Sequence, residues 1–478
     1  MTMTFRTRSP TAYAALLAGA LSLASIPLRA QAPPGDPKPG AGGVEAAAGD
    51  LKPLALAPRV TLDVRPRAHS VVMDDVDGDG KPDLIVAAAG ADSVAVFKGH
   101  GDGTFDAPVY WPVGKAPKFA VTADFNHDGK RDIVTADQDS KTISVLLGNG
   151  DGTFKPKVSY PACNGDHEVA VADFNRDGND DVAVACHGKP YFASVFFGNG
   201  DGTFKPRLDL HPGGEPAALV VGDFNGDGIP DLAYANRADS TVGILLSNGD
   251  GTFKEPLTFA TAKAPHAIRA GDLNGDGILD LVTADDRANQ ITVLFGTGDG
   301  RFVRRQDLPA NSLPKSVAIA DVNGDGRPDI IATNTTYPNC CTYEGSTISV
   351  YLNLGQERFA PRQDVEAGGN PFSLLVRDVN GDGKADILTA NFIDQLPAQA
   401  RYLKVMHESG LSPRLFHLLC LGFAVLCGLV VAGVGWSRAR MASIVGGAVV
   451  TAIVAGAFWE ISRPRTDSPS HITILFGR

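Results

Sequence analysis

A short acidic pattern recurs seven times along this chain of 478 residues, and it constrains the fold more than any other feature. The pattern is D-x-[ND]-x-D-G-x-x-D, and its copies begin at Asp75, Asp124, Asp173, Asp223, Asp272, Asp321 and Asp378. Successive copies start 49, 49, 50, 49, 49 and 57 residues apart. Regular spacing of this kind indicates a repeat architecture, in which each copy is one supersecondary unit that packs on its neighbours.

A second signature, G-x-G-D-G-x-F, follows the acidic pattern in the early repeats. It stands at 99–105, 148–154, 198–204 and 296–302, and at 247–253 with Ser247 in place of the first glycine. In repeat six it decays to the sequence N-L-G-Q-E-R-F at 353–359. We therefore interpret repeat six as a departure from the second signature.

Short β-branched runs lie between the signatures and are bounded by Gly, Asn and Asp. Examples are 168–172, 231–235 and 291–295, and such runs predict strands. About four strands in a repeat of this length are typical of a propeller blade. A linear β-solenoid is the alternative architecture.

The seventh repeat indicates how the ring closes. Its first two strands are predicted at 373–376 and 386–390, its third at 471–477, and its outer strand at 59–64. Terminal strands that share one blade leave no open sheet edge. The predicted fold is therefore all-β, a seven-bladed β-propeller closed by N- and C-terminal strands, with a two-helix transmembrane hairpin inserted in the last blade.

The hairpin is predicted from two uncharged apolar runs at 415–436 and 441–459. Each run is long enough to cross roughly 30 Å of hydrocarbon, and each ends in tryptophan. Only four residues separate them, so we expect a tight hairpin within an insertion at 393–470. A buried helical pair in a soluble fold is the alternative.

The first 32 residues have the three parts of a secretory signal. Arg6 and Arg8 precede an apolar stretch, and small residues follow at 30–32. We expect a signal peptide at 1–32, with an uncleaved anchor as the alternative, and a Pro/Gly/Ala-rich linker at 33–58. The predicted location is exported and membrane-anchored, with the propeller on the extracytoplasmic side, either periplasmic or at the cell surface.

The acidic motif, together with Phe-Gly pairs at 197–198 and 295–296, resembles the FG-GAP/VCBS repeat family, which includes the integrin α-subunit propeller. The resemblance covers 59–392 and 471–478, and it departs in repeat six and at the predicted hairpin. It implies a seven-bladed propeller with calcium in the acidic loops, often extracellular and often binding glycans or proteins. It does not imply one activity.

The motif itself suits calcium because it gathers oxygen ligands in one tight turn. Carboxylates stand at positions 1, 5 and 9, and glycine permits the bend. Position 3 is an asparagine amide in every repeat except the first, where it is Asp77. Ca²⁺ accepts six to eight hard oxygen ligands in a flexible shell. Position 7 would contribute its carbonyl oxygen, so its side chain is free to vary. An EF-hand is excluded because position 12 is never glutamate and strands flank the loop.

We therefore expect up to seven Ca²⁺ ions, and a solvated turn without metal is the alternative at each loop. The predicted ligands at positions 1, 3, 5, 7 and 9 are Asp75, Asp77, Asp79, Lys81 and Asp83; Asp124, Asn126, Asp128, Lys130 and Asp132; Asp173, Asn175, Asp177, Asn179 and Asp181; Asp223, Asn225, Asp227, Ile229 and Asp231; Asp272, Asn274, Asp276, Ile278 and Asp280; Asp321, Asn323, Asp325, Arg327 and Asp329; and Asp378, Asn380, Asp382, Lys384 and Asp386.

The charge balance agrees with metal ligation and disfavours nucleic acid. The formal net charge is −11, and 22 of the 54 acidic residues are predicted ligands in these loops. The sequence has no basic run that would neutralise a phosphate backbone. We expect no nucleic-acid partner.

The face opposite the acidic loops carries the less repetitive segments, because strand one of a blade runs into the loop and strand two leaves it. Cys163 and Cys186 fall on that face and are candidates for a disulfide. Cys340 and Cys341 are adjacent in the long loop of blade six, where a vicinal disulfide and a free pair both stay open. Aromatic and polar residues of blade three decorate the same side, where they suit either ligand binding or ordinary loop filling: His167, His187, Tyr191 and Phe192.

These features support three functional hypotheses. The first is an exported, membrane-anchored calcium-binding propeller that binds a glycan or protein ligand as an adhesion or interaction module. The second is a carbohydrate-active enzyme such as a polysaccharide lyase, since similar propellers occur among lyases. The sequence has no nucleophile elbow and no HExxH motif, so we predict no catalytic residue. The third is a structural protein of envelope assembly, whose hairpin meets other membrane proteins.

Overall fold

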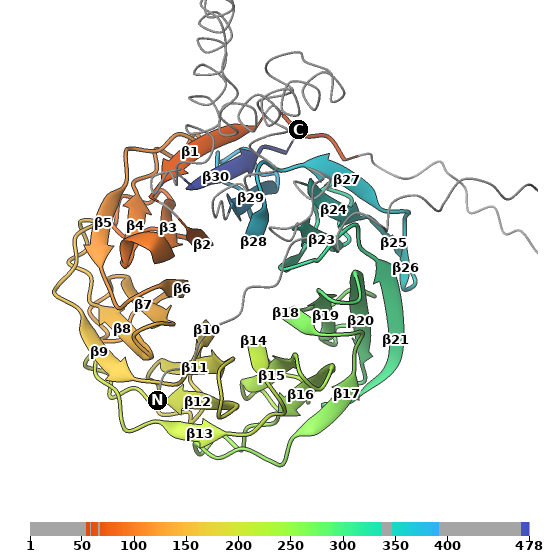
Figure 1. Ribbon diagram of the computed structural model, residues 1–478, viewed down its shortest axis with the longest axis horizontal. Helices are drawn as coiled ribbons and strands as arrows, with labels where there is room; N and C mark the ends of the chain where they lie inside the picture. Colours follow the sequence, from red (N-terminus) through yellow and green to blue (C-terminus); the bar gives the residue numbers. More distant parts are fainter. Residues whose placement is uncertain (1–53, 58, 66, 336–346, 392–469, 478) are drawn as a thin grey trace, which may run out of the picture. The chain divides into compact units, whose positions relative to one another are not determined.

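The computed structural model describes residues 54–57, 59–65, 67–335, 347–391 and 470–477, with only the backbone described at Asp166 and His167. These residues form seven four-stranded antiparallel sheets arranged around one axis (Figure 1). In each sheet the strands follow one another from the axis to the rim, and the first strands of neighbouring sheets pack together. The predicted all-β, seven-bladed propeller is confirmed.

The two inner strands of each blade carry the repeat. The first strands are β2 (Ala68–Asp74), β6 (Pro117–Ala123), β10 (Asp166–Ala172), β14 (Pro216–Gly222), β18 (Pro265–Gly271), β22 (Val317–Ala320) and β28 (Pro371–Arg377). The second strands are β3 (Asp83–Ala88), β7 (Asp132–Asp137), β11 (Asp181–Cys186), β15 (Asp231–Asn236), β19 (Asp280–Asp285), β23 (Asp329–Asn334) and β29 (Asp386–Asn391). Each acidic motif therefore forms the turn between the first and second strands of its blade.

The two outer strands complete each sheet. The third strands are β4 (Ser93–Phe97), β8 (Thr142–Leu146), β12 (Phe192–Phe196), β16 (Thr241–Leu245), β20 (Gln290–Gly296), β24 (Thr347–Tyr351) and β30 (Ser470–Leu475). The outermost strands are β5 (Val109–Pro112), β9 (Val158–Pro161), β13 (Leu208–Leu210), β17 (Leu257–Ala260), β21 (Phe302–Pro309), β27 (Gln363–Glu366) and β1 (Val60–Val64). A small pair, β25 (Asn353–Gly355) and β26 (Arg358–Phe359), and one 3₁₀ turn, η1 (Ala89–Ala91), lie outside the blades.

The second strands are buried along their whole length, because neighbouring blades cover both faces of each sheet. All six residues of β3 (DLIVAA) and of β19 (DLVTAD) are buried. A strand covered on both faces needs a continuous apolar run rather than an alternating one. The hydrophobic core accordingly consists of clusters that lie between adjacent blades, such as the one joining Leu84 and Val86 of blade one to Leu388 and Ile474 of blade seven.

Blade seven is closed by both ends of the described chain, as predicted. Its strand order is β1-β30-β29-β28, with Val60 opposite Ile474 and Ile387 opposite Leu475. Figure 1 shows β1 and β30 side by side at this blade. The ring is closed, so every blade packs on two neighbours.

The predicted transmembrane hairpin is the part of the fold that requires correction. Among the residues that the structure describes, no helix is long and apolar enough to cross a membrane. The apolar runs found there are no longer than strands, and the sheets take up their backbone hydrogen bonds. The described part of the fold is thus a propeller with no membrane-spanning helix, and the runs at 415–436 and 441–459 lie outside the described residues.

The second signature joins neighbouring blades. The amide of its third glycine donates a hydrogen bond to the preceding blade. The acceptor is the carbonyl at position 2 of that blade's acidic motif, as from Gly152 to Val76 (3.2 Å) and from Gly300 to Phe224 (2.8 Å). The phenylalanine of the signature packs against the same neighbour, with the ring centroids of Phe302 and Phe224 6.2 Å apart. The signature therefore joins neighbouring blades through a hydrogen bond and an aromatic contact.

Where the sequence departs from the signature, at Ser247 and in repeat six, a side chain donates the inter-blade hydrogen bond instead. Ser247 donates from its hydroxyl to the carbonyl of Phe174 (3.0 Å). In repeat six, the amide Nδ2 of Asn353 donates to the carbonyl of Leu273 in blade five (2.7 Å). Repeat six has thus changed the chemistry of the contact rather than lost it.

Candidate functional site

The acidic loops are held in shape by hydrogen bonds from their own backbone. In blade four, Asp223 Oδ2 accepts from the amide of Gly228 (2.8 Å), Asn225 Oδ1 accepts from the amide of Asp227, and Asp227 Oδ1 accepts from that of Ile229 (both 2.9 Å). The bond from the position-6 glycine to the position-1 aspartate recurs in all seven loops. The side-chain oxygens of positions 1, 3 and 5 thereby gather on one turn.

The position-9 aspartates join each acidic loop to the second signature. In blade four, Asp231 accepts from the amide of Phe224 at Oδ2 (3.1 Å) and from that of Ser247 at Oδ1 (2.8 Å). All seven blades have both bonds, and in blade seven the second donor is Gly477, next to β30. These aspartates are buried, so the joint satisfies two amides away from solvent.

Burial raises the pKa of the position-9 carboxyl groups. The backbone hydrogen bonds oppose this shift, and the neighbouring carboxylates at positions 5 and 1 add to it. The resulting pKa is about 6 in five blades, at Asp132, Asp181, Asp231, Asp280 and Asp329. A cation beside them would relieve the mutual repulsion.

The donor set fits a hard divalent cation. In blade one, carboxylate oxygens of Asp75, Asp77 and Asp83 lie within 4.8 Å of one another. Lys98 extends its ammonium group to the same place, contacting Asp77 and lying 3.6 Å from Asp79. The other six loops have asparagine at position 3, which adds an amide oxygen as a further neutral donor. Calcium binding by the motif stays a prediction.

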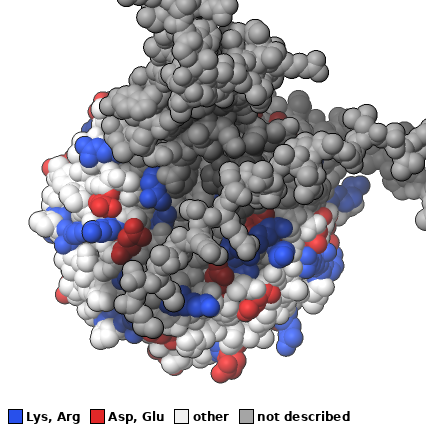
Figure 2. All heavy atoms as spheres, in the orientation of Figure 1, with Lys and Arg blue, Asp and Glu red and all other residues white. Residues whose placement is uncertain are grey.

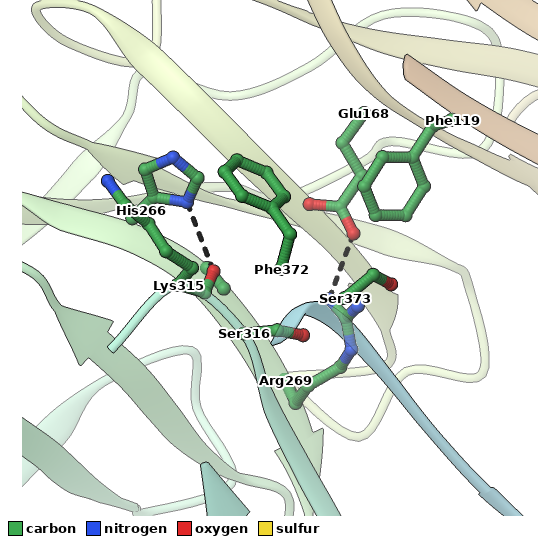
Figure 3. A pocket seen from close by; sticks show the side chains of 9 residues that line it. Phe119, Glu168, His266, Arg269, Lys315, Ser316, Phe372 and Ser373 are labelled. Atoms are coloured by element: carbon green, nitrogen blue, oxygen red, sulfur yellow. Dashed lines mark hydrogen bonds and ion pairs between the residues drawn. The ribbon is translucent and has the colours of Figure 1, made fainter. Parts of the chain in front are cut away.

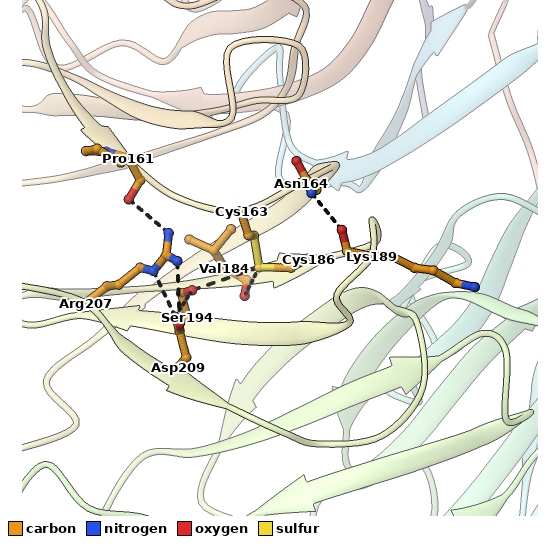
Figure 4. Close-up of a disulfide and its surroundings, with 9 residues drawn as sticks. All are labelled: Pro161, Cys163, Asn164, Val184, Cys186, Lys189, Ser194, Arg207 and Asp209. Atoms are coloured by element: carbon orange, nitrogen blue, oxygen red, sulfur yellow. Dashed lines mark hydrogen bonds and ion pairs between the residues drawn. A yellow bond between two sulfur atoms is a disulfide. The ribbon is translucent and has the colours of Figure 1, made fainter.

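The opposite face contains the disulfide for which the sequence offered two candidates. Cys163, before β10, is bonded to Cys186, at the end of β11, with their Cα atoms 5.7 Å apart (Figure 4). Beside it, Asn164 donates to the carbonyl of Lys189 (2.7 Å), which ties the two flanking loops together. Cys340 and Cys341 lie outside the described residues.

Strand one begins with a β-bulge in six of the seven blades. In blade five, for example, the register shifts between Pro265 and Ala267, so His266 is the extra residue. Bulges re-aim side chains and are common near functional sites. The residues six and five places before each motif therefore meet at the axis, and they differ from blade to blade.

A pocket lies at this axial position. It is small, with a cavity volume of ≈ 20 Å³. It is lined by residues that lie in strand one of a blade or directly before it, from five blades, and Figure 3 shows several of these side chains converging on it: Phe119, Glu168, His266, Lys315, Ser316, Phe372 and Ser373. We call this the axial pocket.

An ion pair spans the axial pocket. Arg269 Nη1 of blade five lies 2.9 Å from Glu168 Oε1 of blade three, and Glu168 Oε2 also accepts from the amide of Leu219 in blade four (3.3 Å). Glu168 is only 5% exposed. Burial raises the pKa of Glu168, and the charge and hydrogen bond of Arg269 oppose that shift.

A second group of ion pairs borders the pocket. Asp286 Oδ2 is 3.0 Å from Arg237 Nη2 and 2.6 Å from Lys315 Nζ, and Arg237 Nη1 is 3.2 Å from Glu215 Oε1. His187 Nε2 lies 3.0 Å from the same carboxylate. The chain thus brings charged residues of blades four to six into one network, held by opposite charges, and His187 of blade three contacts it.

Burial also lowers the pKa of two histidines in this region. The pKa of His266 is well below its usual value, first because of burial and then because Lys315 and Arg237 are close. The pKa of His187 is lowered by burial too, although Glu215 opposes the change. At neutral pH the pocket therefore contains imidazole rather than imidazolium in His266.

Among the blade-three side chains that were singled out from the sequence and that the structure describes, only His187 joins this network; the side chain of His167 lies outside the described part. Tyr191 and Phe192 lie under Lys189 and Arg207, whose charged groups are 5.7 Å and 5.3 Å from the ring centroids.

The pocket residues themselves were missed. A column-by-column comparison of the repeats contains the signal. The residue four places before each motif is apolar in all seven blades, whereas the residue five places before varies among Ser, Phe, Glu and Ala. The repeat position at which the blades differ therefore indicates where residues specific to single blades meet at the axis.

Charges on the face shown in Figure 2 are interspersed. Lysine and arginine side chains lie among aspartates and glutamates on the described surface in view, without a broad field of one sign. A surface of this kind recognises partners through local groups rather than through long-range attraction.

Comparison with protein families identifies the repeats. The FG-GAP-like repeat model matches 75–135, 124–184, 180–234, 223–283, 272–332 and 340–389, and the FG-GAP repeat model matches 314–351. These matches span more than half of the chain. The chain belongs to the FG-GAP repeat family.

Several solved structures are similar at low identity. A structure on the recognition of non-reducing terminal N-acetylglucosamine by an Agrocybe aegerita lectin is 22% identical, with 65% of this chain and 82% of that chain covered and a TM-score of 0.46. BBS1N in complex with ARL6DN is 13% identical, with 70% and 95% covered and a TM-score of 0.48. A protein from Lactobacillus plantarum is 18% identical, with 63% and 86% covered and a TM-score of 0.46. No curated protein matches the chain.

Proposed function

We propose that this protein is an exported calcium-binding propeller that acts as an interaction module and binds a glycan or protein ligand on the face opposite its acidic loops. The observation that carries the proposal is the axial pocket, where unique charged, hydroxyl and aromatic side chains of five blades meet on an otherwise repetitive ring. Rigid scaffolds with irregular, polar-and-aromatic pockets are the usual setting for ligand binding.

The acidic loops would supply the rigidity. Each loop holds three carboxylates in one turn, and calcium bound there would remove their repulsion and fix the joint between the first two strands of a blade. Calcium is then a structural ion, and its ligands are those predicted above. The family resemblance leads to the same assignment.

Export is supported by the disulfide between Cys163 and Cys186. Disulfides form and persist in oxidising compartments and are rare in the reducing cytosol. The expected location is therefore periplasmic or at the cell surface.

The proposal is tested by retention of the full-length protein on immobilised polysaccharides and on envelope protein extracts, in calcium and then in chelator. Calcium-dependent retention without chemical change of the bound material is the expected result. Release of sugar in the same wells would replace the binding module by an enzyme, and no retention on any surface would contradict the proposal.

A further inference from the structure

Repeat one differs from the other six repeats at two positions, and the fold brings these two positions together. Position 3 of its acidic loop is Asp77, whereas every other acidic loop has asparagine there. The residue directly before its second signature is Lys98, whereas the other blades have leucine or phenylalanine at that place. Lys98 Nζ contacts Asp77 Oδ2 and lies 3.6 Å from Asp79 Oδ2, at position 5. The two exceptional residues of repeat one therefore form an ion pair.

This ion pair takes the place of a hydrogen bond that other acidic loops make between positions 3 and 5. In four of those loops the asparagine amide donates from Nδ2 to Oδ2 of the position-5 aspartate, as from Asn225 to Asp227 (2.9 Å). An ionised Asp77 cannot donate, so its second oxygen and that of Asp79 would repel each other. The ammonium of Lys98 reaches both oxygens and supplies the donor that is missing.

Lys98 has given up the packing role that its position has in other blades. In blade two the equivalent residue is Leu147, and its side chain packs beside Gly202 of the following blade. In blade one the corresponding glycine, Gly152, has the side chain of Asp77 as its neighbour instead. An apolar contact between blades has thus been replaced by a charged group at the acidic loop.

The charge of Lys98 matters because Asp77 is poorly solvated. The Asp77 side chain is only 5% exposed, and a carboxylate at that depth needs a compensating charge. The acidic loop of blade one has four carboxylates at positions 1, 3, 5 and 9, one more than each other loop, and Lys98 offsets the extra charge. Oxygens of Asp75, Asp77 and Asp83 lie within 4.8 Å of one another, so a calcium ion bound there would have an ammonium group beside it.

We propose that Lys98 is the built-in counterion of the acidic loop of blade one, and that this loop binds calcium more weakly than the other six loops. Lys98 relieves the repulsion between positions 3 and 5 without metal, and an incoming calcium ion has to displace it or bear its charge. This inference deepens the proposed function and rests on it, since it assumes that the acidic loops bind calcium and ranks them.

The test counts calcium ions on the full-length protein. Native mass spectrometry at a series of buffered free calcium concentrations gives the number bound, and calorimetric titration gives the affinities. We expect six ions to bind together and the seventh to require about tenfold or more free calcium, because the charge of the ligand set tunes calcium affinity.

Two variants act on Lys98 in different ways. Asp77→Asn/Lys98→Leu gives blade one the residues that blade two has at Asn126 and Leu147, so all seven ions should bind in one phase. Lys98→Met leaves four carboxylates without the ammonium, and its seventh ion should bind about tenfold or more tightly than in the unmodified protein. In chelator, Lys98→Met should lower the melting temperature by about 2 °C or more, and calcium should abolish the difference.

Lys205→Met provides the matched control. Lys205 Nζ lies 3.3 Å from Asp177 Oδ2 in the acidic loop of blade three, and its side chain is 48% exposed, against 50% for Lys98. The variant removes the same charge beside a position-5 carboxylate, but position 3 of that loop is Asn175. Its calcium titration should keep the pattern of six ions followed by one.

Three results would overturn the inference. They are seven ions of equal affinity on the unmodified protein, an unchanged seventh ion in both Lys98 variants, and the same gain in affinity for Lys205→Met as for Lys98→Met. Each of these leaves calcium bound and so sustains the calcium part of the proposed function. A protein that binds no calcium at any concentration would remove both.

Discussion

The two faces of this propeller follow opposite rules. On the acidic face, seven loops repeat the same hydrogen bonds, down to the two amides that each position-9 aspartate accepts. On the axial face, strand one of each blade carries a different residue, and the contacts that form there, such as Arg269 with Glu168, occur once. Repetition builds the ring, and its interruption marks the place where chemistry specific to this chain is found.

Removal of calcium should have the largest effect, because it acts on all seven loops together. Chelation is expected to lower the melting temperature by at least 10 °C, since an ion that binds only the folded state stabilises it by mass action. Differential scanning calorimetry with and without chelator measures this. An unchanged melting temperature would mean that the loops are metal-free turns.

The disulfide contrasts with this because it stabilises the other face at one place only. The double variant Cys163→Ser/Cys186→Ser opens a loop whose ends are 23 residues apart, which should cost roughly 3 kcal/mol of unfolding free energy. Denaturant unfolding of both proteins gives the difference. The unmodified protein in reductant should match the variant, and a difference below about 0.5 kcal/mol would show that the bridge does not contribute.

Within the acidic face, position 9 should matter more than position 5 even without metal. In chelator, Asp231→Ala leaves the buried amides of Phe224 and Ser247 without acceptors, at a cost of roughly 2–4 kcal/mol. Asp227→Ala removes an exposed acceptor and should cost less than about 1 kcal/mol. Equal losses in urea unfolding would contradict the joint described here.

The smallest expected effect depends on pH and concerns the far end of strand two. Burial raises the pKa of Asp285 from 3.8 to about 7, against hydrogen bonds from Thr292 and Thr283. Its contribution to stability is therefore complete below pH 3.8 and is lost as the pH rises through about 7. Asp285→Asn cannot ionise, so it should be more stable than the unmodified protein by roughly 1–3 kcal/mol at pH 8.

The control for this prediction is built into the repeat. Blade four has Asn236 at the equivalent position, where Nδ2 donates to the carbonyl of Pro212 (2.8 Å). An amide is therefore tolerated at this depth. Unfolding curves of Asp285→Asn and the unmodified protein at pH 4 should coincide, and a constant difference between pH 4 and pH 8 would exclude ionisation as the cause.

The sequence was sufficient to predict the repeated part of the structure. Seven copies of one motif specify seven blades, and the incomplete seventh repeat specifies how terminal strands close the ring, because backbone pairing rules do not depend on the blade. It was insufficient for contacts between side chains far apart in the chain. Nothing local to Glu168 indicates that Arg269, 101 residues later, will pair with it across the axis.

Two finer interpretations also changed with the structure. The second signature of repeat six was described as decayed, but Asn353 makes the inter-blade bond with a side-chain amide where blades two, three and five use a glycine amide. Hydropathy predicted a helical hairpin, and the described fold contains strands alone apart from η1. A sequence pattern identifies residue types, whereas the same hydrogen bond can be donated by different chemical groups, such as a backbone amide or a side-chain amide.

Closure by β1 and β30 has a consequence for synthesis. The ribosome makes six blades and half of the seventh before it reaches Ser470, so the outermost strand β1 waits for a partner until β30 has been translated. Until then the blades form an open arc rather than a ring, and closure depends on a strand that is made after all the others described here. A stalled or prematurely cleaved chain would expose unpaired edges, which makes it a natural target for chaperones and proteases.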